Sequence, residues 1–198
     1  KYLKLARTAR DEDNSEDAKR YYDMVRTENP ENGEAKVFYQ IYTFWESKKG
    51  ESENRFEAVT KVLAPSIRLI AQSEDTIDAK LDIISAIIKE FAPMTRVANK
   101  SYMDCQTGSA KFASGRILTS GAVGLYNLGD AIASEFPDNA KAMTLAATAW
   151  KEGIEIQNKY YAKQYNYQGR TVDQYVTKIQ KVDSSYVAPK KPGCISFG

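Results

Sequence analysis

Apolar residues recur every three or four positions along most of this chain, and this spacing constrains the fold more than any other feature. The clearest example is a run of five such residues: Ile77, Leu81, Ile84, Ile88 and Phe91. The spacing places them on one face of an α-helix, whereas the alternation typical of half-buried strands is nearly absent from the sequence. We therefore expect an all-α fold.

The same periodicity predicts where the helices begin and end. We expect helices over approximately residues 2–10, 15–28, 34–47, 52–72, 76–91, 109–135, 138–165 and 171–182. Ser15 and Asp138 are suited to cap two of them. Pro65 should kink or split the fourth helix, and Pro93 should interrupt the fifth, because proline lacks an amide donor and its ring clashes with the preceding turn.

Four glycines fall within the helix expected over residues 109–135, at positions 115, 121, 124 and 129. An interior glycine costs about 0.5–1 kcal/mol relative to alanine, so we expect neighbouring helices to approach closely there. The short Gly121–Gly124 segment lacks the strand and the lysine of a phosphate-binding loop, which favours helix packing.

Bulky, small and aromatic residues at the start of the chain follow a spaced pattern that is completed by a proline. The residues are Tyr2, Leu5, Ala6, Ala18, Tyr22 and Pro30. This pattern resembles a tetratricopeptide repeat, which is a pair of antiparallel helices. The chain is similar to uncharacterised bacterial proteins that contain such repeats. The match is clearest over residues 1–33, and a second unit is degenerate.

The resemblance implies one helical domain over residues 1–188. Residues 1–65 would form repeat-like hairpins, residues 66–188 a bundle of longer helices, and residues 189–198 an irregular tail. It also implies a non-enzymatic scaffold that binds a peptide or protein partner in a groove. The groove positions would include Leu3, Arg7 and Arg10. Arginines there could bind an acidic peptide, although solvated surface charge is the favoured interpretation.

The sequence contains no histidine, which excludes Ser-His-Asp and Cys-His catalysis and the Glu-x-x-His metal motif of helical bundles. Its two cysteines, Cys105 and Cys194, are too far apart to indicate a zinc site or a disulfide framework. Glu90 and Asp82 could act as an acid or base only in a pocket, and the edge of a solvated helix is their favoured role. We therefore expect no enzymatic activity, no catalytic or metal-binding residues and no cofactor.

Residues 159–191 suggest an alternative function, because they contain seven basic and two acidic side chains in a chain whose net charge is only +2. This basic, tyrosine-rich surface would bind nucleic acid or an anionic membrane. Its residues are Lys159, Tyr160, Lys163, Tyr167, Arg170 and Lys178. Tyr161 and Tyr165 continue an apolar stripe and are expected to be buried, so we consider nucleic-acid binding the less favoured reading.

No apolar run approaches the ~20 residues needed to span a bilayer, so we expect no transmembrane segment. The scarcity of cysteine favours the reducing cytoplasm. Because the first residue is Lys1 rather than methionine, we also expect that a further segment preceded it.

Overall fold

The computed structural model describes residues 1–48, 50–104, 110–160 and 172–189. In these ranges it contains helices and no strand, which confirms the all-α prediction. The helices, in chain order, are α1 (Tyr2–Asp11), α2 (Ser15–Glu28), α3 (Gly33–Trp45), α4 (Ser52–Gln72), α5 (Ile77–Asp104), α6 (Ala110–Glu135), α7 (Ala140–Tyr160) and α8 (Val172–Gln180).

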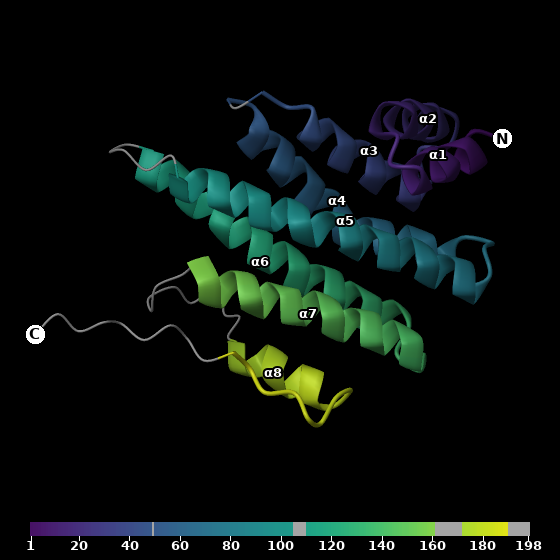
Figure 1. Cartoon of the computed structure of the whole chain (residues 1–198). Coiled ribbons are helices and arrows are strands. Elements are labelled where there is room, and N and C mark those ends of the chain that lie inside the picture. Colours follow the sequence, from purple (N-terminus) through teal and green to yellow (C-terminus); the bar gives the residue numbers. More distant parts are fainter. Residues whose placement is uncertain (49, 105–109, 161–171, 190–198) are drawn as a thin grey trace, which may run out of the picture.

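The helices form a layered array in which α6 packs on α4, α5 and α7 (Figure 1). The hairpin of α1 and α2 packs on α3, and α4 lies between α3 and α6. The largest interface joins α6 to α7, and the short helix α8 lies against α7 on the side of the molecule away from α1 and α2.

Small and aromatic side chains join the first two helices. Ala6, Ala18 and Tyr22 are completely buried, and the ring of Tyr22 stacks on that of Phe38 in α3 with centroids 5.1 Å apart. Alanines at the α1–α2 contact let the two helices approach, and the aromatic rings fill the space toward α3. This packing fixes the position of α1 relative to the start of α3.

Asparagine caps the N-termini of three helices. The caps are Asn14, Asn32 and Asn139, whose side-chain oxygens accept backbone amide protons at 3.2, 2.8 and 2.9 Å. Each bond satisfies one of the amide groups that a first helical turn leaves unpaired. The caps expected at Ser15 and Asp138 are therefore each displaced by one residue, to the neighbouring asparagine.

Neither proline divides its helix, so the predicted interruption at Pro93 and the predicted split at Pro65 are wrong. Pro65 lies within a continuous α4 and Pro93 within a continuous α5. Both prolines are exposed, so the carbonyl groups that they leave unpaired one turn earlier face water. Leu63 and Ile67 are buried on either side of Pro65 and hold both halves of α4 against the core.

The glycines of α6 lie where other helices approach it, as predicted. A Cβ atom at Gly121 would lie 2.5 Å from Cγ2 of Thr95, and one at Gly129 would lie 2.5 Å from Cδ1 of Trp150. These separations are shorter than van der Waals contact. The surroundings of Gly115 lie outside the described residues.

The helix α8 has nine residues and buries few of them. Only Tyr175 and Ile179 are buried in it. Burying one such side chain contributes about 1.5–3 kcal/mol. Helices shorter than ~12–15 residues are marginal in water, so α8 depends on these contacts for its structure.

Candidate functional site

Three polar side chains from α1 and α2 converge on a buried carboxylate at the start of α3. Glu34 is only 2% exposed. Its Oε2 accepts hydrogen bonds from Nη2 and Nε of Arg7 at 2.6 and 3.0 Å. Its Oε1 accepts from the Tyr22 hydroxyl at 2.9 Å and from Nη1 of Arg10 at 3.3 Å. We call Arg7, Arg10, Tyr22 and Glu34 the Glu34 cluster.

Contacts within the cluster shift the pKa of Arg7 and of Tyr22. Hydrogen bonds to Glu34 raise the pKa of the Arg7 guanidinium, which therefore stays charged. Burial and, after it, the charge of Glu34 raise the pKa of the Tyr22 phenol far above its usual range, so the hydroxyl remains a donor. Two cations thus compensate the buried anion, and each also lies near a second carboxylate: Arg7 is 3.6 Å from Asp75 and Arg10 is 2.9 Å from Asp11.

The residues expected from the sequence to line a peptide groove were Leu3, Arg7 and Arg10, and the structure gives each of them contacts within the chain. Arg7 and Arg10 are both engaged with Glu34, and Leu3 is half-buried against the hydrophobic core. An acidic peptide would have to compete with Glu34 for the two guanidinium groups. The sequence offered no signal for this pairing, because Glu34 is 27 residues from Arg7 and 24 from Arg10.

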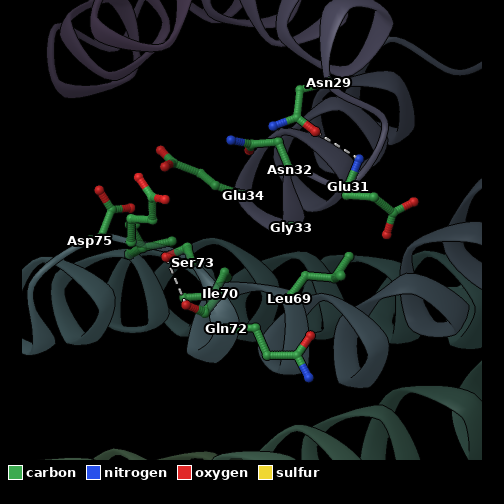
Figure 2. Close-up of a pocket in the computed structure, with 12 residues that line it drawn as sticks. Asn29, Glu31, Asn32, Gly33, Glu34, Leu69, Ile70, Gln72, Ser73 and Asp75 are labelled. Atoms are coloured by element: carbon green, nitrogen blue, oxygen red, sulfur yellow. Dashed lines mark hydrogen bonds between the residues drawn. The ribbon is translucent and has the colours of Figure 1, made fainter.

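A cleft of about 530 Å³ lies beside the Glu34 cluster, between the α2–α3 turn and the α4–α5 turn. Figure 2 shows the carboxylates of Glu34 and Asp75 on the same side of the gap, with Asn29 and Glu31 across the α3 N-terminus from them. The lining residues are Asn29, Glu31, Asn32, Gly33, Glu34, Leu69, Ile70, Gln72, Ser73, Glu74, Asp75 and Ile83.

Gly33 brings the two walls of this cleft together. A Cβ atom at this position would lie 2.5 Å from the carbonyl oxygen of Ser66 in α4. Only glycine therefore allows the first turn of α3 to approach α4 so closely. The contact sets the depth of the cleft between the two turns.

The lining of the cleft carries four carboxylates and no lysine or arginine: Glu31, Glu34, Glu74 and Asp75. Arg7 reaches in from outside the lining, with its Nη2 3.6 Å from Oδ2 of Asp75. Three apolar side chains, Leu69, Ile70 and Ile83, provide the nonpolar part of the wall. A negatively charged cleft with apolar patches is suited to a cationic side chain with an aliphatic stem.

Within the part of the chain that the structure describes, no three His, Cys, Asp or Glu side chains are grouped to hold a metal ion. Among the same residues, every helix is either too short or too polar to cross a lipid bilayer.

The basic surface expected over residues 159–191 is only partly described. Lys159 is exposed on α7, whereas Lys178 lies 2.7 Å from Oδ1 of Asp130 and over the rings of Tyr175 and Trp150. One of its expected cations is therefore paired within the chain. The side chain of Tyr160 and residues Lys163, Tyr167 and Arg170 lie outside the described residues, as do Tyr161 and Tyr165.

Compared with known proteins, the chain matches no family model, no curated protein and no solved structure.

Proposed function

We propose that this chain is a non-enzymatic interaction module that binds a protein partner through a basic segment placed in the cleft beside the Glu34 cluster. The observation that carries the proposal is the composition of the cleft: a volume of about 530 Å³ lined by four carboxylates and no cationic side chain. The resemblance of the first hairpin to a tetratricopeptide repeat favours the same class of function.

The carboxylates differ in what they can offer a partner. Glu34 is occupied by the two arginines, so it contributes mainly to the shape of the site. Glu74 is exposed and Asp75 is half-exposed, and both lie on the α4–α5 turn. They are the groups that an incoming lysine or arginine would meet, and at Asp75 it would compete with Arg7, whose Nη2 lies 3.6 Å from Oδ2. The methylene groups of the incoming side chain would contact Leu69 or Ile70.

Electrostatic recognition of this kind is sensitive to salt and modest in strength. Each exposed ion pair contributes about 0.2–1 kcal/mol, so affinity requires several contacts along the partner segment. The presence of only two cysteines among 198 residues supports a cytoplasmic setting for this interaction.

The test uses the full chain and a short labelled peptide of alternating arginine and leucine. We expect the parent to bind it, and the double variant Glu74→Lys/Asp75→Lys to bind about tenfold or more weakly. The matched control is Glu51→Lys/Asp173→Lys, which changes the net charge equally at exposed positions outside the cleft.

A second peptide with glutamate in place of arginine should not bind the parent. Equal losses in the two double variants would show that net charge, not the cleft, attracts the peptide. Preference for the glutamate peptide would instead support the groove residues Arg7 and Arg10 and overturn this proposal.

A further inference from the structure

Residues 172–189 form a strap that lies along one side of α7 and ends near its C-terminal part (Figure 1). The strap consists of α8 followed by an irregular segment from Lys181 to Pro189. Its binding surface on α6 and α7, which we call the strap groove, is made by Tyr126, Asp130, Trp150, Lys151 and Asn158.

The first anchor of the strap combines stacking with a shared carboxylate. The ring of Tyr175 stacks on Tyr126 with centroids 3.8 Å apart and planes inclined by 3°. Asp130 accepts hydrogen bonds from the Tyr175 hydroxyl at 3.1 Å, Lys178 at 2.7 Å and the Trp150 indole at 3.1 Å. One pocket, made by the Tyr126 ring and the Asp130 carboxylate, thus binds both Tyr175 and Lys178, which are three positions apart.

The second anchor is an ion pair between Lys151 of α7 and Asp183, which follows α8. Lys151 Nζ lies 2.9 Å from Oδ2 of Asp183 and 4.9 Å from the centre of the Tyr186 ring. Its charge therefore meets both a carboxylate and the face of an aromatic ring.

The third anchor is a hydrogen bond from the Asn158 side chain to the backbone of the strap. Nδ2 of Asn158 donates to the carbonyl oxygen of Pro189 at 3.2 Å. Asn158 is only 9% exposed, yet its Oδ1 has no hydrogen-bond partner among the residues that the structure describes. An asparagine amide can bind a backbone carbonyl and a backbone amide together, and here the acceptor is left unused. The groove therefore retains a buried acceptor that its own strap does not satisfy.

The strap is held to the rest of the molecule by few buried side chains. In α8 only Tyr175 and Ile179 are buried, and a helix of nine residues does not persist without its contacts. Elements with few buried side chains open at a lower free energy than the core does. Detachment would leave the larger α6–α7 interface in place.

We propose that the strap groove is a second protein-binding site, independent of the acidic cleft, and that the strap is its intramolecular competitor. The partner is a protein segment with the chemistry of the strap: an amphipathic helix bearing an aromatic residue and a lysine three positions later, followed by an acidic residue and an extended stretch. A better-matched segment satisfies Oδ1 of Asn158 with a backbone N–H and displaces the strap.

The experiment measures binding of a labelled peptide corresponding to residues 172–189 to three full-length proteins. The first is the parent, and the second is Tyr175→Ala/Lys178→Ala, which weakens the anchoring of the strap. The third adds Asp130→Ala to the second. The same peptide with Tyr175 and Lys178 replaced by alanine is the control ligand.

We expect the double variant to bind the peptide about tenfold or more tightly than the parent, because removing a competitor raises the fraction of open grooves. The triple variant and the control peptide should show no binding. Circular dichroism should show that the double variant retains the helical signal of the remaining chain.

Equal affinity for parent and double variant, or no binding to either, would overturn the proposal. So would loss of cooperative folding in the double variant, because the strap would then be an integral part of the core. Light scattering that shows concentration-dependent dimers of the parent would assign the groove to the strap of a second copy rather than to a different partner.

Discussion

Nη2 of Arg7 lies 2.6 Å from Oε2 of Glu34, which joins the first helix of the chain to the first turn of the third across 27 residues of sequence. The carboxylate is almost fully buried, whereas the guanidinium remains about one-third exposed. The ion pair therefore holds the α1–α2 hairpin against α3 at the edge of the acidic cleft. We therefore expect loss of this ion pair to lower the free energy of unfolding more than it weakens partner binding in the cleft.

Glu34→Gln should lower the free energy of unfolding by about 2–4 kcal/mol, because two arginines lose a charged acceptor in a partly desolvated site. Urea denaturation measures the change. Glu31→Gln is the matched control, since the side chain of Glu31 is 74% exposed and its replacement should change stability by no more than about 0.5 kcal/mol. Similar midpoints for the two variants would mean that the Glu34 cluster contributes little to folding.

Ala18→Leu should destabilise the protein by about 1–3 kcal/mol, because the added atoms overpack the contact between α1 and α2. Ala18 has no exposed surface. Ala140→Leu at an exposed position in α7 makes the same chemical change and should be nearly neutral. An unchanged denaturation midpoint for Ala18→Leu would show that the hairpin packs in another way.

Gly129→Ala should destabilise α6 despite the better helix propensity of alanine, by about 1–3 kcal/mol. The new Cβ would lie 2.5 Å from Cδ1 of Trp150 and 2.9 Å from the carbonyl oxygen of Ala146. Gly50→Ala has open space around it and should leave the thermal midpoint unchanged or slightly raised. A gain in stability at Gly129 would be incompatible with the close approach of α6 and α7.

Glu90→Gln tests the pH dependence of stability. Burial and, after it, the charge of Asp13 raise the pKa of Glu90, while Arg10 opposes the shift. Between the pKa of the unfolded chain, near 4.5, and the higher pKa of the folded chain, the folded protein binds more protons. Stability conferred by this group therefore falls as pH rises through that window.

Glutamine does not ionise, so the Glu90→Gln variant does not lose stability in this way. Its free energy of unfolding relative to the parent should therefore increase as pH rises from about 4 toward 7. Urea denaturation at a series of pH values gives the comparison. A relative stability that decreases with pH would contradict the sign of the shift.

The basic surface should not act as a strong nucleic-acid or membrane site. At physiological salt, the purified protein should bind single-stranded DNA, duplex DNA or anionic vesicles no more tightly than ~10⁻⁵ M, the range of nonspecific contacts. Titrations at two salt concentrations would compare the parent with Lys159→Glu/Lys163→Glu/Lys178→Glu. Submicromolar binding that is lost in a folded triple variant would favour the alternative function.

The helical fold could be predicted because apolar spacing is a local property of the sequence. The boundaries of α6 and α4 agree with the expected helices to within one residue at each end. The prolines were misjudged because their effect depends on exposure, which spacing alone does not give. Pro65 and Pro93 lie on the solvent side of helices that are anchored elsewhere.

The candidate site was less accessible to sequence reasoning. Glu34 occupies the first turn of a helix, where acidic residues are common for reasons of the helix dipole, so nothing marked it as buried. The cleft joins residues 29–34 to residues 69–83, and this proximity follows from how α3 packs on α4. Arg7 and Arg10 were singled out as groove residues, and their partner within the chain could be identified only from the structure.

The position of Trp150 gives the molecule an optical property. Its indole is 2% exposed and lies against Asp130, Tyr175 and Lys178, whereas Trp45, the other tryptophan in the sequence, is 43% exposed. Fluorescence of the parent is therefore the sum of emission from the shielded Trp150 and from Trp45, which acrylamide readily quenches. In a Trp45→Phe protein, only the shielded emitter remains, and a red shift with new quenching would register the departure of α8 from α7 in real time.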